Sequence, residues 1–94
     1  MKIHLNNFDG NIYNLLRKAG YHLDKHQRED RASFSRALSG DKYPRFHIYY
    51  DSKKKILYLH LDQKAPKYES SPDHGAEYDG RPVEEEAEKI KSLL

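Results

Sequence analysis

The sequence predicts an α+β fold in one domain, residues 1–94, with the order α-β-β-β-α and two helices packed on one face of a three-stranded antiparallel sheet. Apolar residues recur at helical spacing near both ends of the chain, and apolar and polar residues alternate in the middle, as in strands. A chain of 94 residues also suits one small core. A short N-terminal strand, with Met1, Ile3 and Leu5 on one side, would extend this sheet.

The first helix is predicted between Asp9, a suitable N-cap, and Gly20, a suitable residue just beyond the C-terminal cap. The second is predicted at residues 82–94, where Pro82 suits the first turn. Its early glutamates and late lysines complement the helix dipole. The apolar stripes are Ile12, Leu15, Leu16 and Ala19 in the first helix, and Val83, Ala87, Ile90 and Leu94 in the second.

The three central strands are predicted from alternation. The first is RASFSRAL, residues 31–38, and the other two form a hairpin within PRFHIYYDSKKKILYLHLDQK, residues 44–64. The turn chemistry leaves two registers open, with His47 opposite either His60 or Tyr58. Both registers place the same apolar residues on the core face: Phe46, Ile48, Tyr50, Leu57, Leu59 and Leu61.

Two polar stretches are predicted as connections. Residues 22–30, HLDKHQRED, are expected to be a solvated link between the first helix and the first strand. Residues 63–81 contain prolines, glycines and paired serines without periodicity, and are expected to form a long loop. Long loops in small domains are usually functional or mobile.

Composition narrows the functional classes. The absence of cysteine excludes disulfides and thiolate metal ligands. No stretch has the apolar length of a signal peptide or a membrane span, so we expect a cytoplasmic protein without a membrane partner. Residues 1–64 carry 13 Lys and Arg against 7 Asp and Glu, a net +6, whereas residues 65–94 carry 4 against 8, a net −4. This asymmetry fits a polyanionic partner, or equally an attraction between the two halves.

The sheet face opposite the helices is expected to be open, and its residue types favour a small RNA-binding or regulatory protein. Tyrosine and histidine rings stack on bases, and lysine and arginine bind phosphates. A merely solvated polar face would explain the same residues. The candidate RNA-binding residues are Arg31, Arg36, Arg45, His47, Lys53, Lys54, Lys55 and Tyr58.

A metal-dependent hydrolase or nuclease is the alternative. His60 and Asp62 are two residues apart on a predicted strand and therefore share a face, and the following loop is long enough to bring His74 and Glu77 to them. Two imidazoles and one or two carboxylates suit a divalent metal such as zinc or manganese. The other explanation is a polar latch that holds the loop on the sheet. A third possibility is a protein-interaction module that docks through its tyrosines, so enzymatic activity stays open.

Residues 12–27 also carry a family resemblance. The segment NLLRKAGYHLDKHQ, with its leucine pair followed by KAGY, resembles the first helix and following strand of HicA-type toxin endoribonucleases, which have a double-stranded-RNA-binding-type α-β-β-β-α fold. That family has its active histidine in a Gly-Ser-His run, which this sequence lacks, so no catalytic residue is carried over. The acidic start of the last helix also differs from double-stranded-RNA-binding domains. The C-terminal segments LHLDQK and HGAEYDG resemble small bacterial proteins without an assigned activity.

Overall fold

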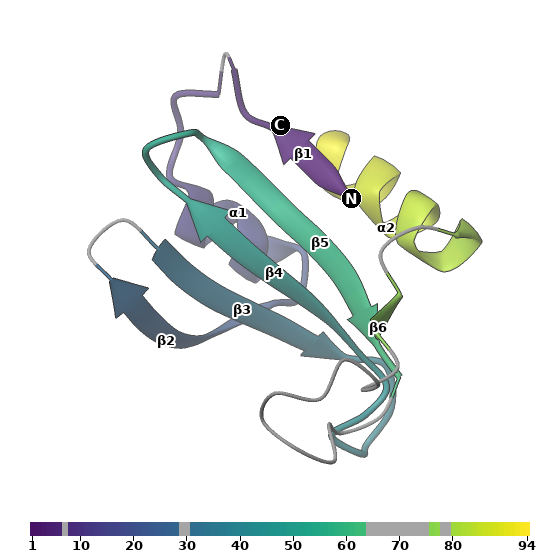
Figure 1. The fold of residues 1–94 in the computed structure, drawn as a ribbon. Coiled ribbons are helices and arrows are strands. Elements are labelled where there is room, and N and C mark those ends of the chain that lie inside the picture. The colour runs from purple at the N-terminus through teal and green to yellow at the C-terminus, as the bar shows by residue number, and fades with distance from the viewer. Residues whose placement is uncertain (7, 29–30, 64–75, 78–79) are drawn as a thin grey trace.

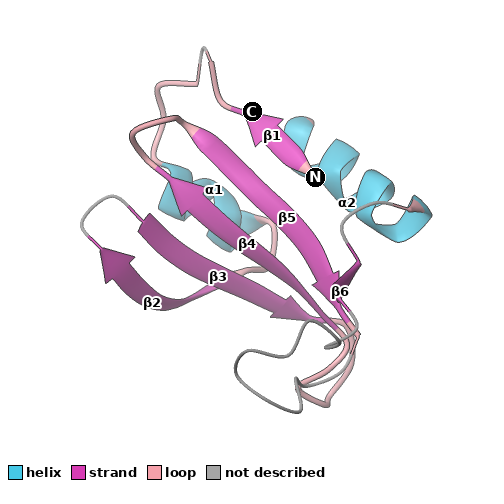
Figure 2. Ribbon diagram, in the orientation of Figure 1, coloured by secondary structure: helices cyan, strands magenta, loops and turns pink. Residues whose placement is uncertain are grey.

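The computed structural model describes residues 1–6, 8–28, 31–63, 76–77 and 80–94, and it has an α+β fold with two helices and an antiparallel sheet (Figures 1 and 2). The elements in chain order are β1 (Lys2–His4), α1 (Ile12–Lys18), β2 (His22–Arg28), β3 (Arg31–Ala37), β4 (Arg45–Asp51), β5 (Ile56–Asp62), β6 (Ala76–Glu77) and α2 (Arg81–Lys91). No helix in these ranges is long and apolar enough to cross a bilayer.

The sheet has the strand order β1-β5-β4-β3-β2, with β6 also paired to β5. All of these pairings are antiparallel. Strands β3, β4 and β5 are the three that alternation predicts, and β1 confirms the short N-terminal strand. The outer edge of β5 is divided between two short strands, because β1 pairs with residues 56–58 and β6 pairs with Leu61 and Asp62.

The prediction of only three strands is wrong, because the predicted connection at residues 22–30 is a strand over its described residues, 22–28. Residues 22–28 form β2, an edge strand whose partner is β3. Two register shifts, between Leu23 and Lys25 and between His26 and Arg28, interrupt the pairing. Such irregularities break the strict alternation by which a strand is recognised, and an edge strand accepts polar residues, so the sequence pattern is lost. Within the predicted loop of residues 63–81, the structure describes the short strand β6.

The turn between β4 and β5 selects one of the two open registers. Asp51 Oδ1 accepts hydrogen bonds from the backbone N–H groups of Lys53 and Lys54, at 3.0 and 3.1 Å. Lys55 then adopts a φ of 55°, which closes the turn so that Asp51 pairs with Ile56. Counting outward from that pair, His47 lies opposite His60.

Helix α1 begins two residues later than predicted. Asn11, not Asp9, is the N-cap, and its side-chain oxygen accepts hydrogen bonds from the N–H groups of Tyr13 and Asn14. Asparagine and aspartate cap helices about equally well, so residue type does not distinguish these positions. The predicted end is confirmed, because Gly20 has a φ of 98° just beyond the C-cap.

Helix α2 begins with Pro82 in its first turn, as predicted, and it ends at Lys91. Leu94 therefore lies beyond the helix, and 42% of its surface is exposed, so its predicted place in the buried stripe is wrong. The rest of that stripe is buried, namely Val83, Ala87 and Ile90.

In the view of Figure 1, α1 lies behind the sheet and α2 lies on the right, next to β1. The apolar side chains of both helices join those of the sheet in one cluster. The predicted core face of the hairpin is confirmed, although Tyr50 is only partly buried. The cluster includes Ile3, Ile12, Leu15, Leu16, Phe34, Phe46, Ile48, Leu57, Leu59, Leu61, Val83 and Ile90.

A charged cluster lies within the packing between sheet and helices. The Arg36 Nη2 group donates to Glu86 Oε1 at 2.8 Å, and the Tyr21 hydroxyl donates to Glu86 Oε2 at 2.6 Å. The Glu86 side chain is 5% exposed. Arg36 is a candidate RNA-binding residue by sequence, but β3 directs its side chain toward α2 and away from the face opposite the helices.

Candidate metal centre

The polar face is the side of β3, β4 and β5 that faces away from the helices, and it faces the viewer in Figure 1. Because side chains alternate along each strand, the register decides which polar residues are neighbours on this face. The cross-strand pairs are Ser33 with Tyr49, Ser35 with His47, Tyr49 with Tyr58, His47 with His60, and Arg45 with Asp62.

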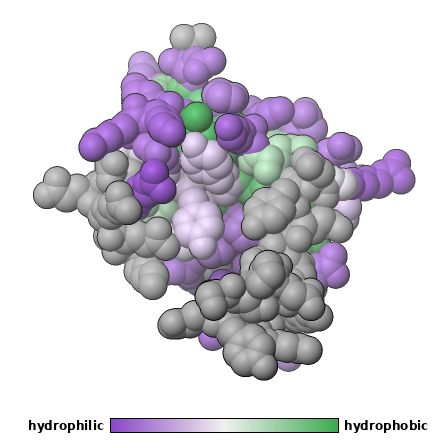
Figure 3. All heavy atoms as spheres, viewed as in Figure 1, coloured by the Kyte–Doolittle hydropathy of each residue, from purple (hydrophilic) through white to green (hydrophobic). Residues whose placement is uncertain are grey.

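The expectation of an open, solvated face is wrong at its centre. His47 is 7% exposed and His60 and Asp62 are each 6% exposed, and Ser33 and Ser35 are buried beside them. These side chains bond to one another in place of water. Among the described residues no buried side-chain nitrogen or oxygen lacks a hydrogen-bond partner. In Figure 3, pale side chains gather over the middle of this view, among strongly hydrophilic ones.

Three side chains at the centre converge on one point. His47, His60 and Asp62 each offer a ligand atom, and these three atoms all lie within 4.8 Å of one another. His60 Nε2 is 2.9 Å from Asp62 Oδ1, and His47 Nδ1 is 3.3 Å from Asp62 Oδ2. Burial alone would raise the pKa of Asp62, but the hydrogen bonds and charges of His47 and His60 hold that pKa well below its usual range. We call these three candidate ligands, His47, His60 and Asp62, the metal cluster.

Aromatic and cationic side chains border the metal cluster. The Tyr49 ring stacks on His60 with centroids 5.8 Å apart and lies 4.4 Å from the ring of His47. The Arg45 Nε atom is 3.4 Å from Asp62 Oδ2, and its guanidinium lies over the Tyr43 ring. The cluster therefore has an aromatic wall on one side and a cation on another.

A second set of polar residues lies beside the cluster on β2 and β3, and only Ser33 of this set contacts it. Ser33 Oγ lies 2.6 Å from His47 Nε2 and donates to Asp24 Oδ2 at 3.3 Å. Ser35 donates to the other carboxylate oxygen of Asp24 at 2.8 Å. His22 Nε2 is 3.2 Å from that same oxygen, Oδ1. Asp24 thus anchors two buried serines, one of which contacts a member of the metal cluster.

The structure brings together only part of the metal site that the sequence predicts. His60 and Asp62 lie side by side on β5, as strand alternation requires. The third member of the cluster is His47, which the sequence predicts as an RNA-binding residue. His74 and the side chain of Glu77 lie outside the described residues.

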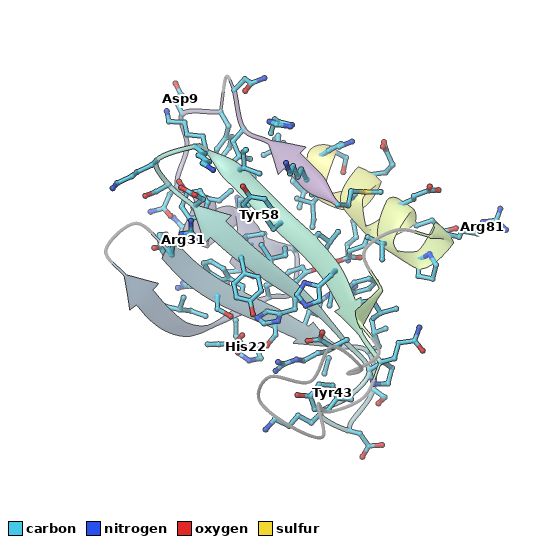
Figure 4. The ribbon with its side chains drawn as sticks, viewed as in Figure 1. Asp9, His22, Arg31, Tyr43, Tyr58 and Arg81 are labelled. Carbon is cyan, nitrogen blue, oxygen red and sulfur yellow. The ribbon has the colours of Figure 1, made fainter. Side chains whose placement is uncertain are left out.

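The predicted RNA-binding residues separate into several environments. Arg31, at the start of β3 in Figure 4, is 3.5 Å from Asp51, and Tyr58 on β5 is half-buried. Arg45 pairs with Asp62 and His47 is buried. The lysines at residues 53–55 are exposed in the β4–β5 turn.

Sequence reasoning did not find Ser33 and Asp24. Ser33 and Ser35 alternate with Ala32 and Phe34, which indicates that they share a face, but not that this face meets two histidines. The sequence predicts a connection around Asp24 and therefore assigns it no partner strand. One sequence feature could have indicated the contact between Ser33 and His47. Ser33 and Ser35 are small polar residues on one predicted strand, and His47 is on the next.

Comparisons of the chain with protein-family models, with curated proteins and with solved structures found no match. The proposal for its function therefore depends on the chain's own residues and their geometry.

Proposed function

We propose that the protein is a metal-dependent hydrolase that binds one divalent ion through His47, His60 and Asp62 and cleaves phosphodiester bonds of RNA. The observation that carries the proposal is the convergence of three ligand atoms within 4.8 Å of one another. Two of the residues come from β5 and one from β4, so a rigid sheet holds all three.

The donor set suits zinc or manganese. Zinc binds imidazole nitrogen and carboxylate oxygen at about 2.0–2.2 Å, which puts neighbouring ligand atoms about 3.4 Å apart in a tetrahedron. The separations of 2.9 and 3.3 Å from Asp62 to the two histidines are close to that requirement. Three protein ligands leave a fourth position for water, as in catalytic zinc sites. A bound ion would lower the pKa of that water and supply a nucleophile.

The surroundings of the cluster favour an anionic substrate with aromatic bases. Along the β4–β5 hairpin the polar face presents first the lysines of residues 53–55, then Tyr49 and Tyr58, then the metal cluster and finally Arg45. Strand residues advance about 3.3 Å each, so these groups follow one line across several nucleotides. Cations along this line would bind phosphates, and the tyrosines would stack on bases.

The first test is stoichiometric metal binding. We expect the wild-type protein to bind one equivalent of zinc or manganese, and His60→Ala to lose it, because two ligands remain. At a metal concentration of 100 times Kd, binding to the folded state alone adds about 2.7 kcal/mol to stability. Elemental analysis and thermal unfolding with and without metal measure both effects. Cleavage of a single-stranded RNA oligonucleotide should depend on the metal and on His60.

His22→Ala is the matched control, since the His22 side chain is 70% exposed and lies outside the metal cluster. This variant should bind metal and cleave RNA like the wild type. Wild-type protein that binds no divalent ion would refute the proposal, as would equal losses in the two histidine variants. Metal binding without cleavage would refute the hydrolase and retain the metal site.

RNA binding without cleavage is the second candidate, and the exposed lysine turn beside Tyr58 favours it. Replacing the lysines of residues 53–55 together by alanine should weaken binding to every RNA sequence and reduce its salt dependence, because fewer counterions are released. Tyr58→Ala should weaken binding and leave the salt dependence unchanged. Fluorescence anisotropy across a salt series measures both.

The control for the salt-series experiment replaces Lys89 and Lys91 by alanine. Both lysines lie in the last turn of α2. Loss of charge there should leave affinity nearly unchanged. Equal weakening in the control would show only a general effect of charge, and unchanged affinity in the triple variant would remove the turn from the binding site. A protein that binds neither metal nor RNA would favour a protein partner for the tyrosine-rich part of the polar face.

A further inference from the structure

We propose that Ser33 and Asp24 are positioning residues that hold His47 in the tautomer whose Nδ1 lone pair faces the metal. The inference rests on the proposed metal site and assigns a role to two residues outside the cluster. Ser33 comes from β3 and Asp24 from the edge strand β2, so two neighbouring strands would prepare a ligand on β4.

The direction of the hydrogen bonds carries the inference. An ionised carboxylate only accepts hydrogen bonds, so the contact between Ser33 and Asp24 Oδ2 uses the serine proton. The Ser33 oxygen is then left to accept from His47, whose Nε2 atom lies 2.6 Å away. A protonated ring donates from both nitrogens, and in that state Nδ1 of His47 donates to Asp62. A neutral imidazole has one N–H group, so a proton at Nε2 leaves Nδ1 as an acceptor.

This acceptor, Nδ1 of His47, faces a second acceptor, a carboxylate oxygen of Asp62. Nδ1 of His47 lies 3.3 Å from Asp62 Oδ2, so a lone pair and a carboxylate oxygen point toward each other. A metal ion bound between them would replace this repulsion with two coordination bonds. His60 Nε2, 2.9 Å from the other oxygen of Asp62, would supply the third ligand. Metal-ligating histidines commonly have the second ring nitrogen held in this way, which fixes ring orientation and tautomer.

The opposite direction of the hydrogen bond between Ser33 and His47 would mean a different chemistry. If Ser33 donated its proton to His47 Nε2, then Nδ1–H would donate to Asp62, in the arrangement of a serine nucleophile with its base and orienting carboxylate. Ser33 is 3% exposed, however, so its hydroxyl is poorly placed to meet a substrate. The nearby carboxylate of Asp24 also offers the serine proton an acceptor. Burial and the second acceptor therefore favour the metal-binding direction.

Ser35 provides a matched control for Ser33. It lies two residues away on the same strand and face, is 2% exposed, and donates to the same carboxylate at 2.8 Å. Its hydroxyl contacts His22 and Asp24, whereas that of Ser33 contacts His47. Alanine at either position removes a buried hydroxyl and a bond to Asp24, but only Ser33→Ala releases the His47 ring.

The experiment compares zinc titrations of the wild type, Ser33→Ala and Ser35→Ala above the ordinary histidine pKa of about 6.5. Loss of a hydrogen-bond partner of a metal ligand typically weakens metal affinity 10- to 100-fold. We expect a decrease in zinc affinity of that size for Ser33→Ala. Ser35→Ala should keep an affinity close to the wild type. Equal losses in both variants, or none in either, would overturn the positioning role.

Nitrogen-15 NMR spectra of the histidine rings show which ring nitrogen carries the proton. This observable does not depend on the stability of the fold. In metal-free wild-type protein His47 should carry its proton on Nε2, and zinc should shift the Nδ1 resonance. A proton on Nδ1 would overturn the inference, even if Ser33→Ala fails to fold. If the wild type binds no zinc, the proposed metal site fails. The tautomer in metal-free protein still tests the hydrogen-bond direction by itself.

Discussion

Leu59→Ala should lower the free energy of unfolding by roughly 2–5 kcal/mol, a large share of the stability of a small domain. Leu59 has no exposed surface and lies in the middle of β5, the strand that pairs with β1, β4 and β6. Truncation leaves a cavity that the surrounding sheet and helices cannot fill without moving. Urea unfolding followed by circular dichroism measures the change.

Leu23→Ala is the control, because it removes the same atoms from an edge strand where the leucine is 41% exposed. Surface substitutions of this kind usually change stability by less than about 0.5 kcal/mol. Similar effects in the two variants would contradict the placement of Leu59 in the core.

Glu86→Ala should cost roughly 3 kcal/mol, because it removes one partner of a buried ion pair and leaves the other uncompensated. The Arg36 side chain, 24% exposed, would lose its carboxylate partner, and the Tyr21 hydroxyl would lose its acceptor. Urea unfolding at neutral pH measures the loss. Glu85→Ala is the control, since Glu85 is 72% exposed and its pair with Arg81 is on the surface. Exposed pairs contribute at most about 1 kcal/mol.

The same cluster predicts an alkaline limit to stability. Burial, together with the hydrogen bond and charge of Glu86, raises the pKa of Tyr21 far above its usual value. Above the unfolded pKa of about 10 the folded protein binds more protons than the unfolded chain, so stability falls as pH rises. Below that pH the contribution is fully present. Tyr21→Phe should lessen this alkaline loss, and an unchanged dependence would contradict the buried tyrosine.

The sequence alone determined the elements whose evidence is local. Apolar alternation identified β3, β4 and β5 and the side of each that faces the core, and helical spacing with Gly20 and Pro82 located α1 and α2. These features depend on residues within a few positions of one another. The pairing of His60 with Asp62 on one face follows from the same two-residue period.

The tertiary structure decided everything that depends on how strands pair. The β4–β5 register placed His47 beside His60, and β2, hidden in the sequence by its polar residues and broken alternation, brought Asp24 to Ser33. Arg36 lies on the core side of β3, as alternation indicates, but its partner Glu86 is 50 residues away on α2. Alternation tells which side chains share a face of one strand. Only backbone hydrogen bonds between strands and the packing of distant elements decide which of those side chains meet.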